Sequence, residues 1–394
     1  MISTTRTPNN LPLLEKIQSI FDLNKKEQDI KVVFSPGRIN LIGEHTDYNL
    51  GYVLPAAIDK GILVAIKHTT KNHSSVTAID KEETYDFSLD TIKPLKDGGW
   101  RNYVLGVIDE LLKLNVKISD VEIAFTGNVP GGAGLSSSAA LENGIVFGFN
   151  ELFNLELTLE EMIFISQRAE HNFVGVKCGI MDQYASMFGE KGKALLLNCK
   201  DLTSELIDLN LKDHEFVFIN TNVKHNLAES QYNKRRLSCE KVASFFKVTS
   251  LSDLPSSILK KNKEKLNRED YRNARFVQKE NKRVIKSVKA IAQNDFNRFG
   301  ELLFKSHKGL RDQYQVSCVE LDFLIDCVIE IPEVIGARMM GGGFGGCTLN
   351  LVKKGAGDIF QNVLVAYERK FKIQPTVFKV EIDNGTYLVD LWEG

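Results

Sequence analysis

The segment from Asn128 to Phe147 (NVPGGAGLSSSAALENGIVF) places the tightest constraint on how this chain folds. Val121–Phe125 before it alternates as a short strand does, and Ala139–Leu152 after it carries apolar residues at helical spacing. Between them stand three glycines and three serines: Gly131, Gly132, Gly134, Ser136, Ser137 and Ser138. Glycine lets backbone N–H groups approach a ligand closely, and the first turn of a helix attracts anions. The segment therefore predicts a phosphate-binding loop between a strand and a helix.

The same residues suggest two other interpretations. Serine is a common helix cap, so the same residues could form a turn that binds no ligand. A Walker A loop is excluded, because no GxxxxGK[ST] pattern occurs and no lysine stands at the helix start. A nucleotide bound here would be held by backbone groups, hydroxyls and a metal rather than by a P-loop lysine.

A second segment, Ser35–Ile58, concentrates polar residues between apolar ones. They are Arg38, Asn40, Glu44, His45, Asp47 and Asn49. Sugar hydroxyls donate and accept hydrogen bonds at once, so carboxylates, an imidazole and a guanidinium can all pair with them. His45 and Asp47 alone are too few for a metal site. A polar surface loop is the remaining alternative, but the interspersed Leu41 and Ile42 favour a partly buried polyol site.

The segment Ala169–Gly189 (AEHNFVGVKCGIMDQYASMFG) holds two carboxylates of interest. Glu170 falls near the predicted C-terminal end of a helix, where the dipole disfavours a negative charge, and this mismatch hints at a role such as holding a cation. Asp182 falls just inside a helix that begins near Gly179, where aspartate is a routine dipole partner. Position alone leaves open whether Asp182 is catalytic.

The first part of the chain has a β-rich pattern. Lys31–Phe34 and Ile62–His68 predict strands, and Trp100–Leu112 predicts a helix. Trp100 and Tyr103 on that helix could face an adenine ring, although periodicity by itself favours core aromatic residues.

Gly341, Gly343 and Gly346 match the pattern G-x-G-x-x-G within Gly336–Val352. The dinucleotide fingerprint requires a helix after these glycines. Here Cys347–Val352 alternates as a strand, so we expect a glycine loop between two strands that closes against a neighbouring site, and not a Rossmann fold.

Composition narrows the class of protein. A chain of 394 residues is long enough for two or three domains. A net charge of −1 gives no general attraction to nucleic acid or to an anionic membrane. No run of 18 apolar residues and no signal-peptide core is present, and the six cysteines are scattered without a CxxC pair. We therefore expect a cytoplasmic protein in a reducing compartment.

The character of the sequence changes at about Asp201. Phe216–Asn220 predicts a strand, and TNVKHNLAESQYNKRR predicts a polar turn into a helix that carries Tyr232. Lys260–Lys289 is rich in Lys and Arg at helical spacing. Interleaved Glu and Asp favour a solvated helix over a nucleic-acid-binding face.

Three of these segments together resemble the galactokinase family of the GHMP small-molecule kinases. PGRINLIGEHTDYNLGYVLPAAI resembles the galactokinase signature, PGGAGLSSSAALE the phosphate-loop motif, and ARMMGGGFGGC the third motif, in the correct order. The similarity continues through CGIMDQYAS and TNVKHNLAESQYNKRR, so it covers nearly the whole chain. The first motif is specific to galactokinases and their nearest relatives, and the other two specify only the superfamily. Leu50, in DYNLGY, departs from a frequent glycine but lies past the expected sugar contacts.

The resemblance implies an α/β (α+β) fold of two domains, 1–205 and 206–394, with the active site in the cleft between them. It implies ATP-dependent phosphorylation of the anomeric hydroxyl of D-galactose, giving galactose 1-phosphate and ADP, the first committed step of galactose catabolism. ATP and Mg²⁺ are the implied cofactors, and a monomer is the family expectation.

The resemblance also implies roles for individual residues. Asp182 is similar to the catalytic aspartate, and Arg38 to its partner. The expected sugar contacts are Arg38, Glu44, His45, Asp47, Gly179, Asp182 and Tyr232. The expected triphosphate loop is Gly131, Gly132, Ala133, Gly134, Leu135, Ser136, Ser137 and Ser138. Ser138 (or Ser137) with Glu170 matches the pair that holds magnesium, and Trp100 matches a position near the adenine.

This assignment is chemically consistent. Phosphoryl transfer needs in-line positioning and charge neutralisation more than covalent chemistry. Asp182 would accept the hydroxyl proton, and Arg38 beside it would keep that carboxylate ionised. Mg²⁺ would offset charge on the phosphates.

Three alternatives remain open at this point. Another sugar-1-kinase of the superfamily, such as an N-acetylgalactosamine kinase, would differ only in the pocket around the C2 substituent, which the sequence does not reveal. A galactose sensor without turnover is expected to lose catalytic residues, whereas GLSSSAA, Arg38 and Asp182 are intact. A nucleic-acid-binding protein has the least support.

Overall fold

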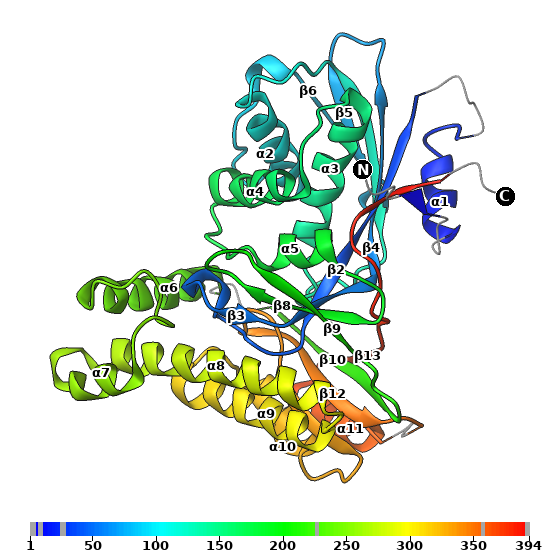
Figure 1. Ribbon diagram of the computed structural model, residues 1–394. Helices are drawn as coiled ribbons and strands as arrows, with labels where there is room; N and C mark the ends of the chain where they lie inside the picture. Colours follow the sequence, from blue (N-terminus) through cyan, green and yellow to red (C-terminus); the bar gives the residue numbers. More distant parts are fainter. Residues whose placement is uncertain (1–4, 7–10, 24–28, 225–227, 356–358, 391–394) are drawn as a thin grey trace.

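The computed structural model describes residues 5–6, 11–23, 29–224, 228–355 and 359–390. Residues 225–227, within the segment TNVKHNLAESQYNKRR, lie outside the described residues. Figure 1 shows a two-domain α/β architecture, with helices α2–α5 and the large sheet in the upper part and helices α6–α11 in the lower part.

The first half of the chain contains both strands and helices. Its elements are β1 (Thr5–Arg6), α1 (Leu11–Gln18), β2 (Lys31–Asn40), η1 (Asp47–Asn49), β3 (Tyr52–Val53), β4 (Pro55–His68), β5 (Ser74–Ala78), η2 (Ile79–Lys81), β6 (Glu83–Phe87), η3 (Leu89–Thr91), α2 (Trp100–Leu112), β7 (Val121–Gly127), α3 (Ser137–Phe153), α4 (Leu159–Ala169), η4 (Glu170–Val174), α5 (Met181–Phe188), β8 (Lys193–Asn198) and β9 (Ser204–Asp208).

The second half begins with a long strand and continues mainly in helices. Its elements are β10 (His214–Lys224), α6 (Ala228–Phe245), α7 (Ser256–Lys261), η5 (Lys263–Lys265), α8 (Arg268–Ala292), α9 (Phe296–Gly309), η6 (Leu310–Tyr314), α10 (Val319–Val328), β11 (Val334–Met339), β12 (Gly345–Lys353), α11 (Gln361–Phe371), β13 (Thr376–Phe378) and β14 (Tyr387–Val389).

The largest sheet has seven strands in the order β1-β14-β2-β4-β7-β5-β6. Helix α3 packs on β2 and β4, and its Gly144 and Gly148 permit this close approach. A Cβ at Gly144 would lie 2.8 Å from Val64 Cγ2, so only glycine fits there without a shift. Strand β14 pairs with β2 although it lies near the end of the chain. The domain boundary predicted at residue 205 stays a prediction. It would place β14 in the second domain, although β14 pairs within this first sheet.

The remaining strands form two smaller sheets, β11-β12-β10-β13 and β3-β8-β9. The glycines of the third motif join β11 to β12, which pair antiparallel. Strand β12 follows these glycines directly, so the prediction of a glycine loop between two strands is confirmed.

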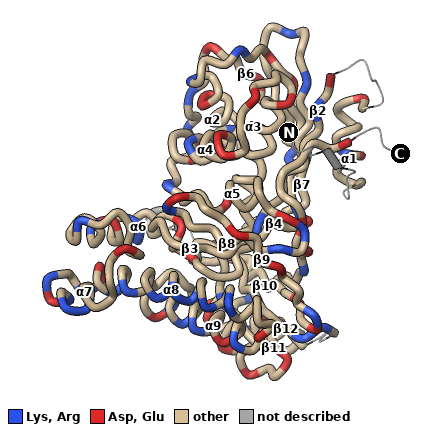
Figure 2. The backbone as a smooth tube through the Cα atoms, in the orientation of Figure 1, with Lys and Arg blue, Asp and Glu red and all other residues tan. Residues whose placement is uncertain are grey.

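The structure extends one predicted strand, excludes one alternative and divides one predicted helix. The strand that begins at Lys31 runs on to Asn40, and Arg38, Glu44 and Asp47 are all buried, so the surface-loop alternative for Ser35–Ile58 is excluded. The basic segment Lys260–Lys289 is not one solvated helix. It is divided among α7, η5 and α8, and α8 buries a face that carries both apolar and polar residues. Lys and Arg recur along α8 (Figure 2).

None of the helices described in the structure is long and apolar enough to cross a membrane.

Candidate active site

Arg38 and Asp182 form a two-pronged ion pair at the centre of the site. Arg38 lies on β2, and Asp182 lies in the first turn of α5. The Nε and Nη2 groups of Arg38 donate to Oδ1 and Oδ2 of Asp182, each at 2.8 Å. The arginine side chain is 6% exposed and the aspartate 27%. Burial opposes the charge on Arg38, but Asp182 and Glu44 raise its pKa overall, so the cation is held in a pocket where Asp182 remains accessible.

The glycine-rich loop is attached directly to this pair. Arg38 Nη1 donates to the carbonyl of Gly134 at 2.6 Å, and Ser136 Oγ donates to Asp182 Oδ2 at 2.5 Å. Ser136 has a left-handed backbone (φ 57°) and makes no side-chain capping bond to α3. The interpretation of this serine as a helix cap is therefore wrong, since its hydroxyl binds Asp182 instead. Ala133 and Leu135 of the predicted loop point into the core, where both are buried.

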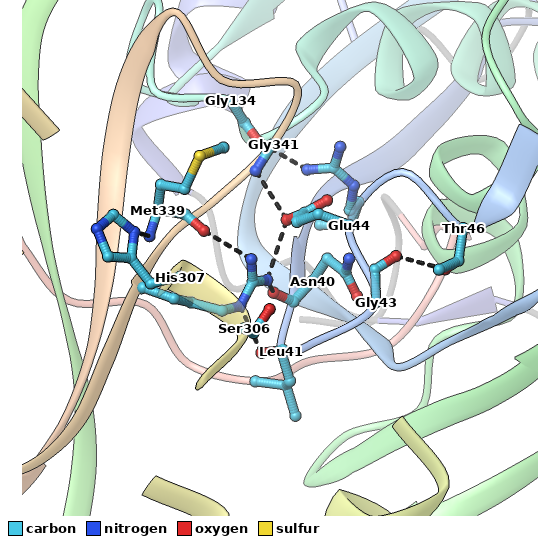
Figure 3. Close-up of polar contacts among 12 residues, drawn as sticks. Asn40, Leu41, Gly43, Glu44, Thr46, Gly134, Ser306, His307, Met339 and Gly341 are labelled. Carbon is cyan, nitrogen blue, oxygen red and sulfur yellow. Dashed lines mark hydrogen bonds and ion pairs between the residues drawn. The ribbon is translucent and has the colours of Figure 1, made fainter. Parts of the chain in front are cut away.

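Glu44 is held by the second half of the chain. Its Oε1 accepts from the backbone N–H of Gly341 at 2.8 Å and from Arg338 Nη2 at 3.0 Å (Figure 3). Arg338 also donates to the carbonyls of Leu41, Met339 and Asn40. Glu44 Oε2 takes no hydrogen bond from any residue that the structure describes. One oxygen therefore anchors the side chain, and the other is free for a ligand.

His45 lies in a cluster of aromatic rings. Its ring centroid lies 5.5 Å from that of Tyr232 and 5.0 Å from that of Tyr314, and its Nδ1 shares a 2.8 Å hydrogen bond with Tyr48 Oη. Burial lowers the pKa of His45 to about 4, so the ring is neutral near pH 7. Its Nε2 is buried and has no partner among the described residues. A neutral imidazole with one nitrogen unpaired suits a hydroxyl ligand.

Asp47 and Gly179 pack against each other. A Cβ at Gly179 would lie 2.1 Å from Asp47 Oδ2, so only glycine fits beside this carboxylate. Burial, followed by the neighbouring Asp182, raises the pKa of Asp47 to about 7. Gly179 lines a cavity of about 440 Å³ next to the site, and Asp47 lines both that cavity and the site itself.

Glu170 is a buried carboxylate at the first residue of η4. Its Oε2 accepts from Gln183 Nε2 at 2.9 Å and from Cys178 Sγ at 3.3 Å. Burial, followed by Asp182, raises the pKa of Glu170 to about 7. Its Oε1 and the hydroxyl of Ser138 take no hydrogen bond from the described residues.

Two cavities are lined by the predicted site residues. A cavity of about 150 Å³ is lined by Arg38, Glu44, His45, Asp47, Glu170, Val176, Cys178, Met181, Asp182, Tyr232, Gly341 and Gly342. A cavity of about 560 Å³ is lined by residues that include Trp100, Tyr103, Gly131, Ser137 and Ser138. Its volume falls within the usual range for ligand pockets. Trp100 on this wall donates from Nε1 to Glu83 at 2.8 Å.

The predicted site residues therefore fall into two groups. The smaller cavity collects the predicted sugar contacts except Gly179, together with Glu170. Trp100, Gly131, Ser137 and Ser138 line the larger one, whereas Ser136 bonds to Asp182. Gly341 and Gly342 line the smaller cavity, as expected of a glycine loop that closes against a neighbouring site. Sequence reasoning missed Arg338 and Gln183. Arg338 lies in the motif ARMMGGGFGGC. An arginine between apolar residues, directly before a glycine loop, was the sequence signal that could have revealed it.

Three family models match the chain. The galactokinase galactose-binding signature matches residues 19–68, the GHMP kinases N terminal domain matches 102–190, and the GHMP kinases C terminal domain matches 287–368.

Curated relatives and solved structures agree with these matches. A galactokinase from Thermotoga neapolitana is 42% identical over 354 residues, which cover 90% of this chain and 98% of that protein. A galactokinase from Clostridium acetobutylicum is 40% identical and covers 94% of this chain and 97% of its own length. The crystal structure of Lactococcus lactis galactokinase complexed with galactose matches with a TM-score of 0.89 at 33% identity, over 95% of this chain and 99% of that chain. A mevalonate kinase structure, at 21% identity and a TM-score of 0.62, shares the fold.

Proposed function

The chain belongs to the galactokinase family of the GHMP kinases, and on that premise we propose how it phosphorylates D-galactose with ATP. The anomeric hydroxyl is the acceptor, and the products are galactose 1-phosphate and ADP. Galactose occupies the smaller cavity, and the nucleotide occupies the larger one beside Trp100.

One observation supports this arrangement above the others. The loop that contributes Ser137 and Ser138 to the larger cavity is bonded through Gly134 and Ser136 to Arg38 and Asp182 in the smaller one. A phosphoryl group held by the loop therefore lies next to the Arg38–Asp182 pair. Transfer requires the two reacting groups to be held in line and in contact, and the bonds between this loop and the Arg38–Asp182 pair support such an arrangement.

Asp182 acts as the general base toward the anomeric hydroxyl. Its two oxygens are held by Arg38 and Ser136, so its orientation is fixed before the sugar arrives. Arg38 keeps a positive charge beside the phosphoryl group as negative charge develops there. Glu44, His45, Asp47 and Tyr232 hold the sugar, since each lines the same cavity and offers a polar group.

Ser138 and Glu170 fit a magnesium ion. Both offer oxygen ligands, which Mg²⁺ prefers, and neither Ser138 Oγ nor Glu170 Oε1 is bonded to a described residue. The described residues contain no group of three His, Cys, Asp or Glu side chains arranged to hold a metal. Magnesium that takes most of its ligands from phosphates and water needs only one or two from the protein. When bound, the ion neutralises charge on the phosphates.

We further propose a cytoplasmic monomer. All six cysteines are free, which accords with a reducing compartment. Sedimentation velocity of the purified protein tests whether it is a monomer.

The test of the function is Mg²⁺·ATP consumption with D-galactose, N-acetylgalactosamine, glucose and arabinose. We expect turnover with galactose. Preference for N-acetylgalactosamine would change the proposed substrate and leave the proposed phosphoryl transfer as it is. Binding of galactose and ATP without turnover would contradict the enzyme and favour a sensor.

A further inference from the structure

Gln183 lies next to Asp182 on α5 but faces a different part of the structure. It is fully buried, and its Nε2 donates to two carboxylates, Glu170 Oε2 at 2.9 Å and Glu142 Oε2 at 3.2 Å. Asn143 fixes the backbone of Gln183 by donating to its carbonyl at 2.9 Å. One amide thus joins α3, α5 and η4 behind the catalytic pair.

Glu142 is also fully buried, and its contacts are incomplete. Glu142 Oε1 and Gln183 Oε1 are both buried without a partner among the described residues. Buried acceptors without a donor are costly, so a native structure normally satisfies them. The two planar groups are already joined through Nε2 and Oε2. A hydrogen on Glu142 Oε1 would complete a cyclic carboxyl–carboxamide pair and would satisfy both oxygens.

We propose that Glu142 and Gln183 form a buried pair that positions the Glu170 carboxylate for magnesium. The proposal rests on the function assigned to Glu170 above, and it adds two positioning residues that do not touch the substrate. Gln183 and Cys178 both donate to Oε2 of Glu170, so they fix the rotation of that carboxylate and leave Oε1 unbonded. Residues that orient a metal ligand in this way typically change metal affinity about 10–100-fold when they are lost.

Gln183→Met is the first test, because methionine keeps the length of the side chain and removes both hydrogen bonds. Gln278→Met is the matched control. Gln278 is equally a buried glutamine on a helix, and its Nε2 donates to the carbonyls of Leu251 and Leu254, away from the site. Mn²⁺ binding in the presence of ADP, followed by electron paramagnetic resonance, measures metal affinity without turnover. We expect about tenfold weaker Mn²⁺ binding in Gln183→Met and none of that loss in Gln278→Met.

Glu142→Gln and Glu142→Met test the pair from its other side. Glutamine supplies a permanent N–H donor to Gln183 Oε1, so Mn²⁺ affinity should stay within about twofold of the wild type, whereas methionine should weaken it about as much as Gln183→Met. Equal losses in both Glu142 variants would overturn the proposal, because the negative charge of Glu142 would then be what matters. If Gln183→Met does not fold, the two Glu142 variants test the proposal without it.

A crystal structure of Gln183→Met separates this inference from the proposed function. If the Glu170 carboxylate keeps its orientation in this variant, the proposed positioning role is overturned. If the carboxylate rotates, the role is supported. Unchanged Mn²⁺ binding in Glu170→Gln would instead remove Glu170 as a ligand, and the positioning role would then be judged on the carboxylate orientation alone.

Discussion

The guanidinium of Arg338 and the carboxylate of Glu44 form a buried ion pair, with Nη2 and Oε1 3.0 Å apart and side-chain exposures of 0% and 4%. Arg338 is the penultimate residue of β11 in the second half of the chain, whereas Glu44 follows β2 in the first. The shape of the predicted sugar-binding segment therefore depends on a residue almost 300 positions away.

Arg338→Lys should destabilise the protein by about 3–5 kcal/mol, because a single ammonium cannot replace a planar group that serves Glu44 and three carbonyls. Urea unfolding measures the loss. Arg298→Lys is the control, since its pair with Glu301 is exposed and should contribute no more than about 1 kcal/mol. Similar unfolding midpoints for the two variants would contradict the structural role of Arg338.

Asp182→Asn should lower kcat by about 10²–10⁴-fold while ATP binding and the folded state persist, because the amide cannot accept the hydroxyl proton. A coupled assay of ADP release gives kcat, and calorimetry gives nucleotide affinity. Asp201→Asn, an exposed aspartate bonded to Thr203, serves as the control. Near-normal turnover in Asp182→Asn would remove this residue from the role of base.

Glu170→Gln should raise the Mg²⁺ concentration needed for half-maximal activity by about tenfold or more, since an amide oxygen carries no charge. Glu110→Gln is the matched control. Glu110 is buried in the same half of the chain and pairs with Arg168 and Lys113, so its loss should cost stability and leave the magnesium titration unchanged. A Glu170→Gln titration that superimposes on the wild-type curve would count against Glu170 as a ligand.

Asp47 gives the unliganded protein a pH-dependent stability. Burial, then Asp182 and Glu44, raise the pKa of Asp47 to about 7, against the opposing effects of the Tyr48 N–H and Arg38. The unfolded chain releases this proton near its ordinary pKa of 3.8. The contribution to stability is therefore fully present below about pH 4 and is lost as the pH rises to about 7. Asp47→Asn should unfold at a higher temperature than the wild type at pH 8.

Sugar binding should show the opposite dependence on pH. A carboxylate accepts from a sugar hydroxyl more strongly when it is ionised, so galactose affinity should fall by up to about tenfold per unit below about pH 7 and level off above it. Calorimetric titration between pH 5.5 and 8.5 measures the curve, and Asp47→Asn should flatten it. A flat wild-type profile would show that Asp47 does not titrate in this range.

Gly179→Ala should raise the KM for galactose by about tenfold or more, because the new methyl group would displace the Asp47 carboxylate that it meets at 2.1 Å. The KM for ATP should stay the same. Gly175→Ala is a control for backbone strain: its φ of 86° is unfavourable for alanine, but no atom lies within 4 Å of the added Cβ. An equal effect on galactose KM in both variants would assign the cause to a change in the backbone of this segment and not to contact with Asp47.

Local patterns in the sequence predicted strands, helices and loops well where neighbouring residues decide the backbone conformation. The glycine and serine spacing at 131–138 predicted a loop before a helix, and α3 begins at Ser137. The alternation after Gly346 predicted β12 and excluded the dinucleotide fingerprint. The resemblance predicted the two-domain fold and the family, and both are confirmed.

Side-chain partners were predicted less well, because a hydrogen bond forms wherever a folded chain brings a donor and an acceptor together. Ser136 has the sequence position of a helix cap, yet it binds Asp182 because the loop has a left-handed turn there. Likewise, nothing in the run CGIMDQYAS shows that Gln183 joins two buried carboxylates.

The sequence by itself thus determined the strands and helices that flank the motifs, the two glycine loops and the membership of the family, since each depends on residues close together in the chain. Only the tertiary structure decided that Arg338 holds Glu44, that Gly134 and Ser136 bind the Arg38–Asp182 pair, and that β14 returns to the first sheet. These contacts join residues far apart in the chain, and packing of the whole core, not local backbone preference, sets the distances between them.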